Sequence, residues 1–384
     1  MKIGIPKERR AHEKRVAATP DSVKKLIGLG FEVVVETDAG ADASFRDSAY
    51  EAAGATLAAD EKATLCDADI VLKVQRPLTQ EEDGPDELSY LKAGAKLIGM
   101  LAPYADPKQL EAYAKAKVDA FAMELLPRIT RAQSMDVLSS QSNLAGYRAV
   151  FEACNVFGRA MPMMMTAAGT VAPARVLILG AGVAGLQAIA TARRLGGIVS
   201  AFDVRPAVKE QVESLGATFV EVKSEETSAA ETAAGYAKEM SEDYKKKQAD
   251  LIHATLKKQD IVITTALIPG KRAPILITEA MVRDMKPGSV IVDLAIEANG
   301  NCELSEPGIV EAYGVTIVAY PNVPSRIAED ASQLYAKNLV NFLTPLVDKE
   351  TKALKIDPAD EVIKGTLLTQ GGAVVHPAFS GKGA

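Results

Sequence analysis

Residues 175–188 of this 384-residue chain, Arg-Val-Leu-Ile-Leu-Gly-Ala-Gly-Val-Ala-Gly-Leu-Gln-Ala, decide its fold together with Val-Ser-Ala-Phe-Asp at 199–203. An apolar strand runs into a glycine turn and a helix, and a second strand ends in an acid. Gly180 allows the tight turn, Gly182 allows the backbone to approach a pyrophosphate, and Gly185 lets the helix pack close to the sheet. The pattern predicts a Rossmann-type, dinucleotide-binding unit.

The start of this helix and the end of the second strand complete the pattern. Val183 and Ala184 stand in the first helical turn, where free N–H groups and the positive end of the helix dipole attract phosphates. Asp203 sits where a carboxylate accepts hydrogen bonds from the adenosine ribose, which predicts NAD rather than NADP. Arg205, two residues later, weakens that inference. An ordinary strand-to-helix turn is the alternative, but strand, helix and acid together favour a cofactor site.

The composition indicates a cytoplasmic enzyme and excludes several other classes. The net charge of -6 argues against a nucleic-acid partner. Cys66, Cys154 and Cys302 are isolated, and no cluster has metal-ligand spacing, so we expect neither disulfides nor a metal site. The first ten residues contain no apolar signal region. The most apolar window, 176–192, is broken by glycines and is too short for a membrane helix.

Alternating strand and helix patterns predict an α/β protein with two Rossmann-like, doubly wound parallel-sheet domains and a cleft between them for the cofactor. The tail from Asp357 is too poor in strands to form its own domain, so we expect it to pack on the first one. The expected domains are therefore 1–136 with 327–384, and an NAD-binding domain at 137–326. In the first domain we expect strands at Lys2–Pro6, Glu32–Glu36, Ile70–Val74, Lys96–Met100 and Val118–Met123, and helices at Asp21–Leu29, Ser48–Ala53, Thr79–Leu91 and Pro107–Ala116.

One connection, from Lys223 to Lys247, is far longer than the usual few residues. It begins with a polar, alanine-rich stretch and carries Tyr236 directly after Gly235. A solvated insertion that ends in a helix is one interpretation. The other is a lid that closes over the nucleotide with Tyr236 as its contact residue.

Further landmarks support a resemblance to a known family along nearly the whole chain. These are Gly-Ile-Pro-Lys-Glu-Arg at 4–9, Glu-Lys-Arg-Val-Ala at 13–17, Ala-Asp-Ile-Val-Leu-Lys-Val at 68–74, the glycine fingerprint, Met-Lys-Pro-Gly-Ser-Val-Ile-Val-Asp-Leu-Ala-Ile at 285–296 and Pro-Asn-Val-Pro at 321–324. With them the chain resembles the alanine dehydrogenase and proton-translocating NAD(P) transhydrogenase family.

Three features favour the transhydrogenase branch of this family. In alanine dehydrogenases, residues matching Arg15 and Lys73 bind the keto acid, and a histidine supplies acid–base chemistry where this chain has Ala102. The loop Pro-Arg-Ile-Thr-Arg-Ala-Gln-Ser-Met-Asp at 127–136 is similar to the transhydrogenase loop that organises the nicotinamide. The segment 235–240 and the methionine-rich segment 161–169 also resemble that branch, although we expect 161–165 to be an apolar connection packed between the domains.

The resemblance implies a site for direct hydride transfer between two nicotinamide rings. It implies that Arg128 orients the nicotinamide carboxamide, that Asp136 holds Arg128 or the ribose, and that Gln133 bridges the two nucleotides. Ser139 would bond the carboxamide. From the residues alone, Arg128 and Asp136 are better explained as an exposed ion pair. The resemblance adds Ala266 and Asn322 to the cofactor-binding residues already named: Gly180, Gly182, Val183, Ala184, Gly185, Asp203, Arg205 and Tyr236.

The resemblance also implies partners. A component that binds NADP(H) and a membrane-spanning component would be separate chains, the chain would form a homodimer, and it would be peripheral on the inner membrane only through those partners. Arg15 and Lys73 would then be structural ion-pair residues. Two other functions stay open: an amino-acid dehydrogenase related to alanine dehydrogenase, and a non-catalytic NAD-binding module.

Overall fold

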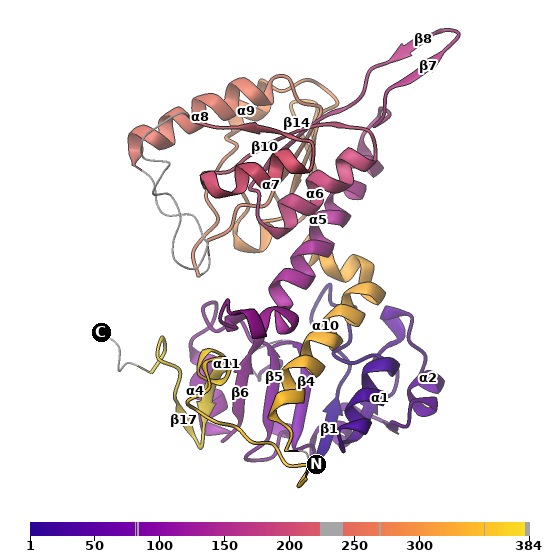
Figure 1. Ribbon diagram of the computed structural model, residues 1–384, viewed down its shortest axis with the longest axis vertical. Helices are drawn as coiled ribbons and strands as arrows, with labels where there is room; N and C mark the ends of the chain where they lie inside the picture. Colours follow the sequence, from indigo (N-terminus) through magenta and orange to yellow (C-terminus); the bar gives the residue numbers. More distant parts are fainter. Residues whose placement is uncertain (81, 83, 223–240, 269, 349, 381–384) are drawn as a thin grey trace. The chain divides into compact units, whose positions relative to one another are not determined.

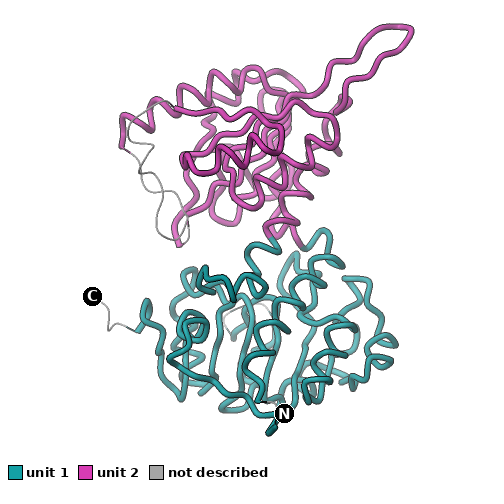
Figure 2. The backbone as a smooth tube through the Cα atoms, in the orientation of Figure 1, with its two compact units in different colours: residues 1–141, 325–384 teal, residues 142–324 magenta. Residues whose placement is uncertain are grey.

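The computed structural model describes residues 1–80, 82, 84–222, 241–268, 270–348 and 350–380. The chain divides into two compact units, 1–141 with 325–384 and 142–324, coloured separately in Figure 2. These boundaries lie within a few residues of the expected ones. Each unit is built around its own mostly parallel sheet, so the expected α/β class is confirmed.

Unit 1 contains an eight-stranded sheet in the order β17-β16-β6-β5-β4-β1-β2-β3. Its six central strands are parallel, while β16 pairs antiparallel with β6, and β17 with β16. The strands are β1 Lys2–Ile5, β2 Glu32–Glu36, β3 Thr56–Ala58, β4 Ile70–Gln75, β5 Lys96–Met100, β6 Asp119–Ala122, β16 Leu367–Gln370 and β17 Ala373–Val374. The helices are α1 Pro20–Gly28, α2 Asp47–Ala52, α3 Glu61–Leu65, α4 Lys108–Lys115, α10 Ala328–Leu343 and α11 Glu361–Thr366.

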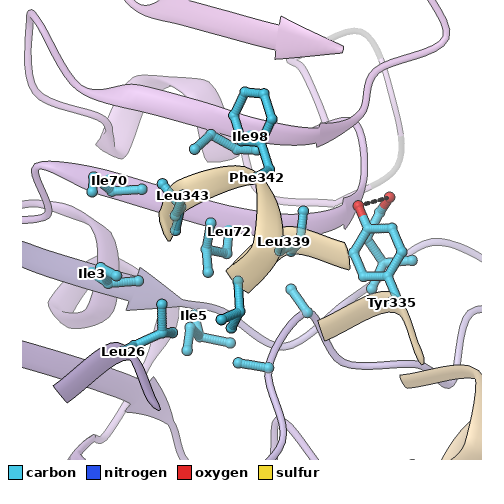
Figure 3. Packing of buried hydrophobic residues seen from close by; sticks show 14 of the residues in the cluster. Ile3, Ile5, Leu26, Ile70, Leu72, Ile98, Tyr335, Leu339, Phe342 and Leu343 are labelled. Atoms are coloured by element: carbon cyan, nitrogen blue, oxygen red, sulfur yellow. Dashed lines mark hydrogen bonds between the residues drawn. The ribbon is translucent and has the colours of Figure 1, made fainter. Parts of the chain in front are cut away.

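Helix α10 supplies the centre of the unit 1 core. Tyr335, Leu339, Phe342 and Leu343 recur at the spacing of one helical face and are fully buried against residues of β1, β4 and β5 (Figure 3). The Tyr335 hydroxyl donates to the backbone carbonyl of Lys73 over 2.7 Å. Residues from the end of the chain therefore complete a sheet that its beginning forms.

Unit 2 contains a seven-stranded sheet in the order β11-β10-β9-β12-β13-β15-β14, in which only β14 is antiparallel. The chain starts at the centre, moves outward to β11 and returns to β12, so the strand order reverses between β9 and β12. The strands are β9 Arg175–Leu179, β10 Ile198–Phe202, β11 Thr218–Val220, β12 Ile261–Thr264, β13 Val290–Asp293, β14 Gly308–Ala312 and β15 Val315–Ala319.

Helices cover both faces of the unit 2 sheet (Figure 1). Along β9, Val176 and Ile178 join a cluster with α5, α6 and α7, whereas Leu177 and Leu179 join one with α8 and α9. This alternation follows from the two-residue period of a strand. The helices are α5 Val137–Val156, which crosses the unit boundary, α6 Val183–Arg194, α7 Lys209–Ser214, α8 Glu242–Leu256 and α9 Glu279–Arg283.

A two-stranded hairpin in unit 2 corrects one expectation. Strands β7 (Met164–Thr166) and β8 (Gly169–Val171) extend away from the rest of the unit in Figure 1. Met161 is buried, but the side chain of Met165 is 79% exposed, and Met163 and Met164 are exposed as well. The prediction that 161–165 packs as an apolar connection is therefore wrong for the last three methionines.

The predicted helix at Thr79–Leu91 is also wrong, because among the residues described there only a short 3-10 helix, Glu87–Tyr90, forms. Gly84 has a positive φ of 141° and Pro85 follows it, which is incompatible with a continuing helix. Glu82 is instead drawn to Arg10 and Arg76. Side-chain contacts with distant residues override the local preference in this segment.

Candidate functional site

The predicted glycine turn joins β9 to α6 and has the required close contacts. Gly180 has a positive φ of 101°, and a Cβ there would lie 2.6 Å from the hydroxyl oxygen of Thr265. A Cβ on Gly185 would lie 1.8 Å from the carbonyl oxygen of Gly180. By contrast, a Cβ on Gly182 would meet nothing within 4 Å. Two glycines are therefore required by packing, and the third borders open space, as a phosphate-binding turn requires.

The first turn of α6 is open to a ligand. The helix starts at Val183 with Gly182 as its N-cap, and no side chain caps it. Val183 is exposed and Ala184 is partly exposed. Sequence reasoning missed Gly146 of α5, where a Cβ would lie 2.0 Å from the carbonyl oxygen of Ala184. A glycine within a helical pattern was the available signal for this close crossing of helices.

Asp203 and Arg205 form a bidentate ion pair. The guanidinium donates to both carboxylate oxygens of Asp203, over 2.9 and 2.7 Å, and the Arg205 backbone N–H donates to one of them over 2.9 Å. The backbone N–H of Ala181 donates to the other oxygen over 2.8 Å. The carboxylate is thus tied to the glycine turn and its charge is balanced. Repulsion of a 2′-phosphate by Asp203 alone cannot decide the nucleotide.

Ala266 and Asn322 lie after strands β12 and β15 of the same sheet. The side chain of Asn301, fully buried, accepts from the backbone N–H of Ala266 over 3.0 Å and donates to its carbonyl over 2.9 Å. Asp293 at the end of β13 accepts from the Asn301 backbone N–H over 2.8 Å. Asn322 is buried and has a positive φ of 50°. Sequence reasoning missed Asn301 and the role of Asp293, because both act through distant backbone.

The other predicted group lies in unit 1, on the 3-10 helix η4 (Thr130–Met135) and its flanks. Arg128 and Gln133 are exposed there. Asp136 follows η4, and its carboxylate accepts from both the backbone N–H and the hydroxyl of Ser139, so these two residues shape the start of α5. The structure brings Asp136 and Ser139 together and leaves Gln133 presented to solvent.

Arg15 and Lys73 are buried and engaged with acidic or polar side chains of unit 1. Arg15 donates to both oxygens of Glu13, over 2.8 and 2.7 Å, and to Gln141 over 2.8 Å. The Lys73 ammonium lies 2.7 Å from a carboxylate oxygen of Glu87. Burial disfavours the charged form of Lys73, but the surrounding glutamates raise its pKa above the ordinary value. The expectation that both are structural ion-pair residues matches this geometry.

The carboxylates around Lys73 exceed the cations that face them. Burial raises the pKa of Glu8 to about 7, and burial with a hydrogen bond to Glu87 raises the pKa of Glu61 to about 8. One oxygen of each of Glu8, Glu61 and Glu87 is buried with no hydrogen-bond partner. Two carboxylates that face one another need a shared proton. This cluster therefore holds protons near neutral pH.

Position 102 carries no acid–base group. Ala102 is exposed with a positive φ of 49°, and its backbone N–H donates to the buried carboxylate of Glu124. Tyr236, the predicted lid residue, lies outside the described residues. Within the described stretches of the chain, no group of three or more histidine, cysteine or acidic side chains is placed to hold a metal ion. A helix with the length and apolar character needed to cross a membrane is likewise missing from the described residues.

The strand order of unit 2, its glycine turn and the uncapped helix α6 define a dinucleotide-binding protein with a second α/β unit. Two family models match this chain: the N-terminal domain of alanine dehydrogenase/PNT over residues 4–145 and its C-terminal domain over 149–377. The chain belongs to the alanine dehydrogenase/PNT family, as the sequence motifs indicated.

Named relatives cover the whole chain. The first of the separate parts of NAD(P) transhydrogenase subunit alpha in Rhodospirillum rubrum is 62% identical over 385 residues, with 100% of both chains covered. Alanine dehydrogenase of Bacillus subtilis is 30% identical over 99% of this chain and 94% of its own length. A crystal structure of transhydrogenase from Sinorhizobium meliloti is 52% identical, with a TM-score of 0.87 over 98% of this chain and 100% of that one.

Proposed function

We propose that this chain is the NAD(H)-binding component of a proton-translocating transhydrogenase, equivalent to that first piece of subunit alpha. The high identity to the R. rubrum chain over the full length of both supports this assignment, and the lower identity to alanine dehydrogenase is consistent with it. Hydride would pass between NAD(H) on this chain and NADP(H) on a partner component. A membrane component would couple the transfer to proton translocation.

The observation that carries the choice of branch is the state of the two buried cations. A keto-acid substrate needs cations that can meet its carboxylate and an acid–base group near its carbonyl. Arg15 and Lys73 already engage Glu13 and Glu87, and Ala102 has no ionisable side chain. Bringing a keto acid there would cost the buried ion pairs. Hydride transfer between two rings needs neither group, because its main requirement is position.

In this mechanism the residues of the chain bind and orient. Bound NADH supplies a hydride from its nicotinamide ring, and NADP⁺ on the partner accepts it. Gly180, Gly182 and the uncapped first turn of α6 would hold the pyrophosphate. Arg128 would donate to the nicotinamide carboxamide. Gln133 would help to seat the second ring, since its amide both donates and accepts.

The remaining site residues would complete the nucleotide contacts. Asp203 would accept from the ribose and Arg205 would hold that carboxylate in place, a pairing that supports NAD as the ligand without relying on charge repulsion. Ala266 and Asn322 lie after neighbouring parallel strands, at the edge of the sheet where dinucleotides bind. Tyr236 as a lid residue and a cofactor-binding cleft between the two units stay predictions.

The partners of the chain are also included in the proposal. A chain of this kind requires an NADP(H)-binding component and a membrane-spanning component as separate polypeptides, and it would reach the membrane only through them, on the cytoplasmic side. Homodimer formation is supported by the exposed methionines of the β7–β8 hairpin. An apolar pocket of about 500 Å³ in the same unit, lined by Phe151, Met161 and Leu195 among others, offers further apolar surface.

The test is the variant Gln133→Asn. It shortens the side chain by one methylene without adding charge, so NADH affinity and the fold should stay nearly unchanged. Transfer from NADH to an NADP analogue on the partner component, followed by stopped flow, should slow by more than about tenfold, which is roughly 1.4 kcal/mol in the barrier. If NADH affinity falls in proportion to the rate, Gln133 belongs to ordinary cofactor binding.

The alternatives give different results with the wild-type chain. We expect no oxidation of NADH when pyruvate and ammonia are the only other substrates, and steady oxidation in that assay would show an amino-acid dehydrogenase. NADH binding without transfer to any NADP analogue on the partner would show a non-catalytic binding module.

A further inference from the structure

Helix α10 holds the segment that carries Arg128 and Gln133. The side-chain nitrogens of Asn338 and Asn341 both donate to the backbone carbonyl oxygen of Ser134, each over 2.9 Å. The two asparagines are three residues apart, so they lie on one face of α10 in consecutive turns. One carbonyl, directly after Gln133, therefore takes two hydrogen bonds from the same helix.

Asn338 is itself held in a longer series of hydrogen bonds. Its side-chain oxygen accepts from the hydroxyl of Ser140 over 2.7 Å, and the residue is only 7% exposed. Gln141 donates to the same hydroxyl over 3.2 Å and accepts from the buried guanidinium of Arg15 over 2.8 Å. Both ends of the Asn338 amide are thus used, and its orientation is determined by the network. The support extends from the buried Arg15 to Ser134.

The supported segment has little internal stabilisation. η4 is a six-residue 3-10 helix without a side-chain N-cap, and runs of this type longer than three or four residues are uncommon. The backbone bond from Asp136 N–H to the Gln133 carbonyl is long, at 3.4 Å. Ala132 and Met135 are buried beneath the segment, whereas Gln133 is exposed above it. The amides of α10 therefore decide which way the Gln133–Ser134 peptide faces.

We propose that Asn341, together with Asn338, is a positioning residue for hydride transfer, which fixes the peptide after Gln133 and with it the direction of the Gln133 side chain. This inference rests on the proposed function. It assigns Asn341 no contact with either nucleotide. Because a displacement of about 1 Å at a reacting centre can cost on the order of a hundredfold in rate, a clamp at the adjoining peptide has a measurable effect.

The variant Asn341→Asp tests the clamp, since it replaces the donor by an acceptor of the same shape. Gln333→Glu is the matched control, because it makes the same change of charge at an exposed position of α10. We expect Asn341→Asp to slow transfer from NADH to an NADP analogue on the partner component roughly tenfold, with the Kd for NADH within about twofold. Gln333→Glu should change neither quantity.

A double-mutant comparison separates positioning from a structural effect. In a Gln133→Asn background, the side chain that the clamp directs is already displaced. Asn341→Asp should then slow transfer by less than about twofold. Equal slowing in both backgrounds, or an unchanged rate in the single variant, would overturn the positioning role.

The bond itself can be observed without any nucleotide. Ser-Met occurs once in the sequence, at 134–135. A chain labelled with carbonyl-13C serine and 15N methionine therefore gives a single correlation for the Ser134 carbonyl. Its carbonyl signal should move upfield in Asn341→Asp and stay in place in Gln333→Glu. A signal that does not move overturns the clamp. A wild-type chain without any transfer refutes the proposed function, and the positioning role with it, whereas the signal still reports the hydrogen bond.

Discussion

Asp203→Asn should convert the nucleotide preference of the chain. The carboxylate of Asp203 accepts from Arg205 and from the Ala181 backbone N–H. An asparagine that keeps its oxygen toward Ala181 must turn its NH₂ group toward Arg205, so the guanidinium loses its partner. Two unit charges about 5 Å apart interact by roughly 3 kcal/mol at an effective dielectric constant of about 20. Because the Arg205 side chain is 16% exposed, water removes some of this energy.

A gain of about 1.5–3 kcal/mol for a 2′-phosphate corresponds to roughly ten- to hundredfold tighter NADPH binding. NADH should bind a few times more weakly, since the ribose loses a charged acceptor. Titration of both nucleotides by fluorescence measures the two Kd values. In Asp203→Asn with Arg205→Gln, the gained NADPH affinity should disappear. Unchanged NADPH affinity in the single variant would show that Arg205 does not face the ribose, and the reasoning would be refuted.

Three further outcomes are expected. The folded chain keeps protons on Glu8 and Glu61, whose pKa values are raised from 4.5 to about 7 and 8, so the free energy of unfolding should fall as pH rises from 5 to 8, by up to about 1.4 kcal/mol per pH unit for each proton; urea midpoints that rise with pH, or a slope unchanged in Glu61→Gln, would contradict this. Gly146→Ala places a Cβ 2.0 Å from the Ala184 carbonyl oxygen and should destabilise unit 2 by about 1–3 kcal/mol in chemical unfolding, against no change if the helices simply separate. Met165→Asp on the exposed hairpin should shift a dimer toward monomer in sedimentation velocity, and an unchanged distribution would remove the hairpin from self-association.

The sequence predicted best those elements whose environment is uniform. Strands β10, β12 and β13 are buried on both faces in a parallel sheet, so each appears as an uninterrupted apolar run with clear bounds. The edge strands β14, β16 and β17 are antiparallel additions without such a run, and they were missed. The Thr79–Leu91 prediction failed because Glu82 binds arginines far away in the sequence, which no local pattern records.

The candidate site divides along the same line. Gly180, Gly182 and Gly185 were found because their role depends on neighbours a few residues away. Gly146 and Asn301 were missed because each acts on the backbone of another element, Gly146 through the absence of a side chain and Asn301 through both ends of its amide. Spacing can reveal a turn, whereas the support of that turn requires the tertiary structure.

The position of α10 in the chain has a consequence for synthesis. Unit 2 is a continuous stretch and can fold as soon as it leaves the ribosome. Unit 1 lacks its central helix, which brings Tyr335, Leu339 and Phe342, and its strand β16 until the final stretch of the chain emerges. At about 5–20 residues per second, the half-built sheet waits on the order of ten seconds or more for them. During that interval β6 presents an open edge, so nascent unit 1 is the region of this molecule that most needs chaperone protection.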